Sequence, residues 1–475
     1  MGVKSRKIKK VVLLGLDGAT FRLIDPMIAE GLLPNFARFR QEGACGPLRS
    51  NIHPITPSAW ASISTGLNPG KHGIFDFRML ERKDYHLRFV TGKDRKGEAI
   101  WTVLNEHGLK TGVVNVPLTY PPEAVDGFMV SGMDAPDGET GWTYPEAFSA
   151  EIRKVVKDYR IDLNVLSVDL DDYVAQVESL LDNRIRLFRY LMEQKKDLEF
   201  LFFVFVETDR LQHVLWKYAD PDGAGYHDPR AESYRKVLQR CYQRIDALLG
   251  EYATKESEDT AWIIVSDHGF GLLEKDVYLN QWLHEIGLLS FKNDSARENI
   301  AFLENIDWTK TRAYSYGFFG NININMKGRE GRGIVDPKEA SRIEEMIRRE
   351  ALSLKDPGTG KSVVTCFFHK EELYQGKWIE RAPDLLLIFK DYAYATRDGY
   401  ESMTSEIFAE PMKYHTGTVP HSGIHRLEGI FMAYVPGERA SLYSKRTITL
   451  CDIFPTVLKL FGIELPLDID GTPIF

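Results

Sequence analysis

The stretch KKVVLLGLDG, residues 9–18, runs from two lysines through an apolar segment to Asp17 and Gly18. A short, uninterrupted apolar run of this kind is typical of a strand buried on both faces, as in a parallel sheet. Two further apolar runs end in the same way, FVFVETD at Asp209 and IIVSD at Asp267. Because ligands of open parallel sheets bind at the carboxyl ends of the strands, we expect these three aspartates to lie together.

Amphipathic segments with helical spacing alternate with the apolar runs along the chain. We expect strands at 9–17, 111–118, 126–132, 197–209, 260–268, 383–389 and 429–435, and helices at 27–43, 98–108, 232–252 and 449–462. A proline inside 27–43 is expected to split that helix. The alternation predicts an α/β fold, a mostly parallel central sheet with helices on both faces. We expect one domain over residues 1–475, with a helical insertion at 140–195 and a cap-like insertion at 290–380.

The composition is that of an ordinary globular protein, with 43% hydrophobic and 27% charged residues in 475. A net charge of −8 argues against a nucleic-acid-binding surface. Because no apolar run approaches the roughly 20 residues that span a bilayer, we expect no membrane-spanning segment. The four cysteines form no C-x-x-C pair, and the N-terminal apolar run is too short for a signal peptide. We therefore expect a cytoplasmic protein; the sequence does not indicate its oligomeric state.

Histidines accompany two of the three aspartates. Asp209 and His213 stand four residues apart, which places both on one face of a helix, and His268 directly follows Asp267. Each residue alone has an ordinary explanation, since aspartates often cap turns after strands and single histidines are common in cores and on surfaces. Two Asp–His pairs at strand ends together predict a divalent metal site. Mixed carboxylate and imidazole donors suit Zn²⁺, Mn²⁺ or a related ion.

The segment TPSAWASISTG, residues 56–66, predicts a helix that begins near Pro57 and ends at Gly66. Thr56 is then expected at the N-cap, where a capping hydroxyl is the ordinary interpretation. The same position also faces free backbone N–H groups and the positive end of the helix dipole, where a phosphate binds. Beside a metal ion such a hydroxyl would be a nucleophile. The remaining hydroxyls lie inside the helix and are poorer candidates: Ser58, Ser62, Ser64 and Thr65.

These motifs resemble the alkaline phosphatase superfamily, and within it the type I phosphodiesterase/nucleotide pyrophosphatase-like phosphohydrolases. The residues that carry the resemblance are GLDG (15–18), T-P-S-A-W-x-S-x-x-T-G-x-x-P-x-x-H-G-I (56–74), D-x-x-x-H (209–213), D-H-G (267–269) and G-x-H (423–425). The resemblance implies hydrolysis of a small-molecule phosphoester, with a diester or pyrophosphate favoured over a monoester. It also implies two divalent metal ions, Zn or Mn.

The resemblance further implies a role for each matched residue. One metal ion would be held by Asp17, Thr56, Asp267 and His268. The other would be held by Asp209, His213 and His425, with His421 and His415 as alternatives for the last ligand. Thr56 would attack phosphorus and form a phosphothreonine that water then hydrolyses.

The substrate side of the site departs from the family. Its asparagine after the H-G-I turn, which helps to hold a phosphate oxygen, is replaced by Phe77. Arg78 beside it would supply a cationic contact. Arg329 in KGREGRG could reach a substrate phosphate, although a solvated basic loop is the simpler interpretation. His72 in the turn is expected to pack structurally.

Three other functions deserve comparison. Sulfatases carry C-x-P-x-R, and CGPLR (45–49) matches those letters, but in sulfatases the cysteine stands at the place of Thr56 and here it lies well upstream. A phosphomutase would use the same metal ions and return the phosphoryl group to a sugar or glycerate hydroxyl, usually through a serine. A non-enzymatic metal-binding protein would be expected to lack some of the ligands, and none of the seven positions is missing.

Overall fold

The computed structural model describes residues 8–136, 140–163, 169–253, 259–292, 302–397, 406–412, 419, 421–437 and 446–475. Backbone contacts divide the chain into two compact units. The first unit comprises residues 1–74, 91–272 and 413–475, and the second comprises 75–90 and 273–412. The range 290–380 falls within the second unit and 140–195 within the first. The predicted organisation, one domain with two insertions, stays a prediction.

The first unit is built on a nine-stranded sheet. Its strands are, in spatial order, β20 (Ile448–Thr449), β2 (Ala44–Arg49), β19 (Glu428–Tyr434), β9 (Thr260–Val265), β1 (Lys10–Leu16), β8 (Phe200–Phe205), β5 (Thr111–Val116), β6 (Gly127–Ser131) and β7 (Thr143–Tyr144). From β9 to β6 all neighbours are parallel. Strands β19 and β7 run antiparallel to the strands beside them. The predicted mostly parallel sheet is confirmed.

Strand β1 shows why the apolar run lacks alternation. Val12, Leu14 and Leu16 enter one hydrophobic core, while Val11 and Leu13 enter the core on the opposite face. Side chains of a strand point alternately to the two faces, so a sheet covered on both sides requires apolar residues at every position. The same holds for β8, where all six residues are buried.

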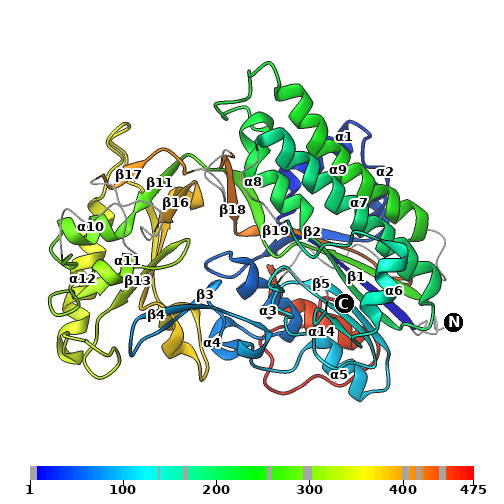
Figure 1. Cartoon of the computed structure of the whole chain (residues 1–475), viewed down its shortest axis with the longest axis horizontal. Coiled ribbons are helices and arrows are strands. Elements are labelled where there is room, and N and C mark those ends of the chain that lie inside the picture. Colours follow the sequence, from blue (N-terminus) through cyan, green and yellow to red (C-terminus); the bar gives the residue numbers. More distant parts are fainter. Residues whose placement is uncertain are drawn as a thin grey trace. The chain divides into compact units, whose positions relative to one another are not determined.

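Helices cover both faces of this sheet (Figure 1). One face carries α1 (Phe21–Ala29), α2 (Pro34–Glu42), α6 (Phe148–Val155), α7 (Leu170–Gln194), α8 (Glu207–Ala219) and α9 (Ala231–Tyr252). The other carries α3 (Thr56–Thr65), α5 (Ile100–Glu106) and α14 (Ile453–Leu460), with the short α4 (Pro69–His72) next to α3. A small antiparallel pair, β10 (Gly269–Leu272) with β18 (Gly423–Arg426), completes the unit. The predicted helices on both faces are confirmed.

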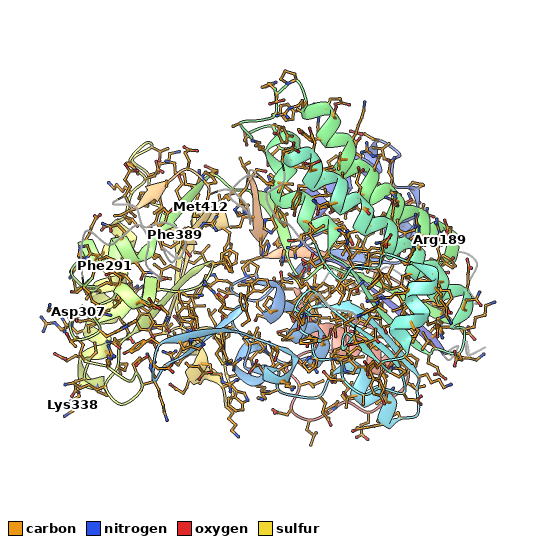
Figure 2. All side chains as sticks on the ribbon, in the orientation of Figure 1. Arg189, Phe291, Asp307, Lys338, Phe389 and Met412 are labelled. Atoms are coloured by element: carbon orange, nitrogen blue, oxygen red, sulfur yellow. The ribbon has the colours of Figure 1, made fainter. Side chains whose placement is uncertain are left out.

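Ion pairs join the two long helices on the outer side of the first unit. Arg189 of α7, labelled in Figure 2, pairs with Glu251 of α9 at 2.6 Å. Arg240 of α9 pairs with Glu178 of α7 at 2.8 Å. Among the described residues, none of the helices combines the length with the apolar character that crossing a bilayer demands.

The second unit has its own hydrophobic core. Its strands form a hairpin, a three-stranded sheet and a four-stranded sheet. They are β3 (Arg78–Glu81) and β4 (His86–Phe89); β16 (Tyr394–Arg397), β11 (Lys275–Tyr278) and β17 (Phe408–Ala409); and β12 (Ala313–Tyr314), β13 (Gly320–Ile324), β15 (Leu385–Phe389) and β14 (Val364–His369). Its helices are α10 (Leu279–Glu285), α11 (Phe302–Asn305), α12 (Pro337–Ser353) and α13 (Lys370–Leu373).

Some elements differ from their predicted form. The run 383–389 does form a buried strand, β15, but it belongs to the antiparallel four-stranded sheet of the second unit. Apolar content reports burial and does not report which sheet a strand joins. The expected strand 197–209 ends at Phe205, because helix α8 begins at Glu207. The helix 27–43 splits as predicted, and Pro34 begins its second half.

Candidate active site

Three neighbouring strands bring the three aspartates together. Strand β1 lies between β9 and β8, all three parallel, so their carboxyl ends meet at one edge. Asp17 follows β1, Asp267 follows β9, and Asp209 stands in the first turn of α8 after β8. All three side chains are buried. The predicted convergence of carboxylates is therefore what the structure shows.

Two of these carboxylates are each held by one oxygen. The indole Nε1 of Trp60 donates to Asp17 Oδ2 at 3.1 Å. The backbone N–H of Gly18 donates to Asp267 Oδ1 at 3.2 Å. Each bond fixes the plane of a carboxylate and leaves its second oxygen for another partner.

The third carboxylate follows the same pattern. The guanidinium of Arg210 lies 3.7 Å from Asp209 Oδ2. Within the described part of the chain, the opposite oxygen of each aspartate is buried without a hydrogen-bond partner: Asp17 Oδ1, Asp209 Oδ1 and Asp267 Oδ2. Buried polar atoms are normally satisfied, so three carboxylate oxygens without hydrogen-bond partners at one place are suited to bind a cation.

Three imidazoles are oriented in a matching way. Each has its Nδ1 at a backbone carbonyl oxygen and its Nε2 directed at the aspartates; the pairs are His213 with Gly423 (2.9 Å), His268 with Gly269 (3.1 Å) and His425 with Pro54 (2.8 Å). A carbonyl oxygen can only accept, so it holds the proton on Nδ1 and leaves Nε2 unprotonated, with a lone pair that can coordinate a metal ion. This is how metal-binding histidines are usually fixed.

The Nε2 atoms and bare oxygens form two adjoining groups. In one, Nε2 of His213 and Nε2 of His425 each lie 3.3 Å from Asp209 Oδ1 and 3.1 Å from one another. In the other, His268 Nε2 lies 3.2 Å from Asp267 Oδ2 and 3.5 Å from Asp17 Oδ1. The His268 and His425 rings stack at 3.5 Å between centroids, which joins the groups. Two sets of buried side chains are compact enough to hold a metal ion, Asp17 with Asp267 and His268, and Asp209 with His268 and His425, so His268 belongs to both.

The pKa values of the three aspartates are shifted in different directions by burial and by the neighbouring groups. Burial, together with the neighbouring carboxylates, raises the pKa of Asp17 and of Asp267 well above the usual value. Burial would also raise the pKa of Asp209, but the His213 and His425 imidazoles lower it well below that value. A divalent cation would lower the raised pKa of Asp17 and of Asp267, because a nearby positive charge favours the ionised carboxylate.

Thr56 is the first residue of α3, and the N-cap is Ile55. The predicted N-cap position is therefore wrong by one residue, and no side-chain capping bond forms at this helix start. The hydroxyl faces the site instead, with Oγ1 3.3 Å from His268 Nε2. Gly66 ends the helix in the left-handed region, at φ 70°, as predicted.

Another hydroxyl of α3 meets a histidine, but with the opposite polarity. Ser62 Oγ lies 3.0 Å from His72 Nε2, and the backbone N–H of Ile74 donates to His72 Nδ1 at 3.2 Å. Burial lowers the pKa of His72 to about 3, so the ring is neutral. With Nδ1 accepting, the proton sits on Nε2 and is donated to Ser62. This histidine cannot take a proton from that serine, which fits the structural packing expected of His72.

Among the alternatives for the last histidine, the geometry favours His425. His421 Nε2 lies 3.1 Å from His213 Nδ1, on the outer side of that ring and away from the carboxylates. His415 lies outside the described residues.

The three predicted substrate-binding residues belong to the second unit. Phe77 meets Phe318 edge-on at 6.0 Å, and the Arg78 guanidinium lies 5.7 Å from the same ring. Arg329 is not on a solvated loop; both its terminal nitrogens bond to Asp384 at 2.6 Å. Substrate contacts by these residues stay predictions.

Sequence reasoning missed the residues that hold the aspartates. Trp60 stands one helical turn after Thr56, and that i, i+4 spacing was the available signal. Arg210 directly follows Asp209, and nothing in its neighbourhood separates it from a surface arginine.

The fold and the site define a protein of alkaline phosphatase-like architecture. The structure is similar to that of phosphonoacetate hydrolase from Sinorhizobium meliloti 1021 in complex with phosphonoformate. The match covers 96% of this chain and 97% of the hydrolase chain, with a TM-score of 0.55 and 16% identity. Over 96% of both chains, the structure matches an inactive variant of murine ectonucleotide pyrophosphatase/phosphodiesterase 5 in complex with AMP, with a TM-score of 0.54 and 13% identity.

The model of the type I phosphodiesterase/nucleotide pyrophosphatase family matches residues 11–418. The chain belongs to this family. Human ectonucleotide pyrophosphatase/phosphodiesterase family member 1 is 24% identical over 293 residues, and the mouse protein 23% over 290. These matches cover 58% of this chain but only 25% and 26% of those proteins, so the chain spans about a quarter of their length.

Proposed function

We propose that this protein is a divalent-metal-dependent phosphohydrolase that cleaves a phosphodiester or pyrophosphate bond with Thr56 as nucleophile. One observation carries the proposal. Thr56 is the first residue of α3, and its Oγ1 lies 3.3 Å from His268 Nε2, in the site that also holds the three carboxylate oxygens without hydrogen-bond partners. A nucleophile and a set of metal donors thus converge at the carboxyl edge of the sheet, where this class of fold binds ligands.

The donor set fits two ions. Asp17, Asp267, His268 and the Thr56 hydroxyl would hold one, and Asp209, His213 and His425 the other. Mixed oxygen and imidazole donors favour Zn²⁺ or Mn²⁺. Bound there, the ions would act as Lewis acids that lower the pKa of the hydroxyl and stabilise charge on the phosphoryl group.

The chain's own residues account for the rest of the reaction. Thr56 Oγ1 releases its proton to water and attacks phosphorus; a bond from Oγ1 to phosphorus forms, the bond from phosphorus to the leaving oxygen breaks, and the leaving oxygen takes up a proton from water. The first turn of α3 offers backbone N–H groups and the positive end of the helix dipole to the phosphoryl oxygens. Water then cleaves the phosphothreonine and restores the hydroxyl.

The relatives support phosphorus compounds as substrates. The matched proteins are named as pyrophosphatase/phosphodiesterases and as a phosphonoacetate hydrolase, and one was captured with AMP. None of these matches favours the phosphomutase alternative. Cys45, the cysteine of the sulfatase-like CGPLR, lies in β2 and not at the start of α3. A cytoplasmic location stays a prediction.

A substrate comparison tests the proposal. Metal-loaded protein should hydrolyse bis(4-nitrophenyl) phosphate faster than 4-nitrophenyl phosphate, and 4-nitrophenyl sulfate hardly at all. Thr56→Ala should lower kcat by several powers of ten, while Thr56→Ser keeps measurable activity. Ser64→Ala removes another buried hydroxyl of α3 and serves as the control. A Thr56→Ala variant with the activity of Ser64→Ala would refute the nucleophile, and activity of the metal-free protein would refute the metal dependence.

A further inference from the structure

Trp60 links the helix that carries the candidate nucleophile to the strand that precedes Asp17. It is fully buried, four residues after Thr56 on α3. Its ring fills the space left by Gly15 of β1, where an added Cβ would lie 2.3 Å from the indole Cη2. Because Gly15 stands two residues before Asp17, the ring sets the spacing of the helix and the strand close to the site.

The polar end of the same side chain reaches the carboxylate. Trp60 Nε1 donates to Asp17 Oδ2 at 3.1 Å, and Asp17 Oδ1 is left bare beside His268. An indole N–H can only donate, so Trp60 Nε1 can neither coordinate a metal ion nor accept a proton. Its action on the site passes through Asp17.

Burial alone does not explain this orientation. Trp262 of β9 is as deeply buried, at 1% exposure, and its Nε1 finds no hydrogen-bond partner within the described part of the chain. The core of this protein therefore tolerates an indole N–H without an acceptor. At Trp60 the N–H has an acceptor, and that acceptor is a predicted metal ligand.

We propose that Trp60 is a positioning residue that occupies Asp17 Oδ2, so that Oδ1 alone faces the metal centre in a fixed plane relative to Thr56. The inference rests on the proposed function, since it concerns how the predicted ligand is held. Loss of such a supporting bond typically weakens metal binding by about 10–100-fold. Only the ion held by Asp17 should be affected, because the Trp60 hydrogen bond goes to Asp17, whereas Asp209 serves the other group.

Trp60→Phe and Trp262→Phe form a matched pair in the full-length protein. Both remove an indole N–H from a buried site and lose similar volume, but only the first removes a bond to a ligand. After metal removal, Zn²⁺ is titrated in competition with a chromophoric chelator. The wild type and Trp262→Phe should bind two ions with similar constants, whereas Trp60→Phe should bind one ion normally and the other about 10–100-fold more weakly.

Kinetics separate positioning from general damage. As Zn²⁺ is raised to saturate the weakened site, kcat of Trp60→Phe should recover and the substrate KM should stay near the wild-type value. Trp60→Met, with a more adaptable apolar side chain, repeats the test in case the phenylalanine packs poorly. If neither Trp60 variant folds with or without Zn²⁺, the residue acts in packing and the proposal is wrong.

The two proposals fail differently. A wild-type protein that binds no Zn²⁺ refutes the proposed function. A wild type that binds two ions, together with a Trp60→Phe variant whose two constants equal those of Trp262→Phe, overturns the role of Trp60 alone.

Discussion

Replacing Arg329 by methionine should strongly destabilise the second unit. The guanidinium makes two 2.6 Å bonds to Asp384, which is 8% exposed, and the backbone N–H of Ile324 in β13 donates to the same carboxylate at 2.7 Å. Without the arginine, a buried carboxylate directly before β15 loses its main counter-charge. Lys370, at 3.2 Å, remains as a partner.

The pKa of Asp384 gives the size of the effect. Burial would raise this pKa, but the Arg329 bonds, with the charges of Lys370 and Arg82, lower it from 3.8 to about 2. A carboxyl pKa lowered from 3.8 to about 2 corresponds to about 2.5 kcal/mol of stability above the unfolded pKa. Breaking a buried pair by removing one partner costs about 3–5 kcal/mol. Because Lys370 stays, we expect the lower end, about 3 kcal/mol, or about a hundredfold in the opening equilibrium.

Hydrogen–deuterium exchange of peptides covering β13 and β15 measures this locally, which avoids assuming that two units unfold as one. Arg332→Met, three residues away and exposed, is the control and should cost less than about 0.5 kcal/mol. The pKa of Asp384 is lower in the folded protein than in the unfolded chain. The resulting stability is complete above the unfolded-state pKa and is lost as the pH falls toward the folded-state pKa. The gap between wild type and Arg329→Met should therefore be full at pH 7 and shrink as pH drops from about 4 to 2. Equal protection in Arg329→Met and Arg332→Met would refute this reasoning and leave the arginine available for a substrate.

Three further outcomes are expected. His425→Ala should abolish tight binding of one Zn²⁺ in a chelator competition, whereas His421→Ala should change either constant by less than about tenfold; the reverse result would make His421 the ligand. Removing metal with a chelator should lower the midpoint of thermal unfolding, because an ion present at 100 times its dissociation constant stabilises the folded state by about 2.7 kcal/mol; an unchanged midpoint would argue against a bound ion. Gly66→Ala should cost about 1–2 kcal/mol in urea unfolding, since φ is 70° and the new Cβ would lie 3.0 Å from Phe454; Gly46→Ala, with open space around it, should be near neutral and would expose an error if equally damaging.

The sequence carried much of the fold because the central strands are apolar at every position. Strands such as β1 and β8 need apolar residues on both faces, so their signal does not depend on distant contacts. Strand β15 has the same composition, and only its pairing with β13 and β14 separates it from the central sheet. Such pairings join residues far apart in the chain, and the pattern of apolar residues within one segment does not predict them.

In the site, too, the residues paired locally in the sequence were predictable, whereas the contacts between distant residues were not. Asp209 with His213, and Asp267 with His268, are local pairs whose spacing predicts a shared role. Trp60 acts on Asp17 across 43 residues of chain, and the bare oxygen of each aspartate emerges only when the atoms are placed. Arg329 shows the converse, since a glycine-rich basic loop in sequence proves to be bonded to a buried carboxylate.

The Ser62–His72 contact has a consequence for chemical labelling. A serine beside an imidazole is what fluorophosphonate reagents exploit when they tag serine hydrolases, and a search by distance alone would mark this pair as reactive. Here the Ile74 amide fixes the ring so that the histidine gives its proton to the hydroxyl. Peptide mapping after treatment with such a reagent should therefore find no adduct on Ser62, and any adduct should lie elsewhere in the chain.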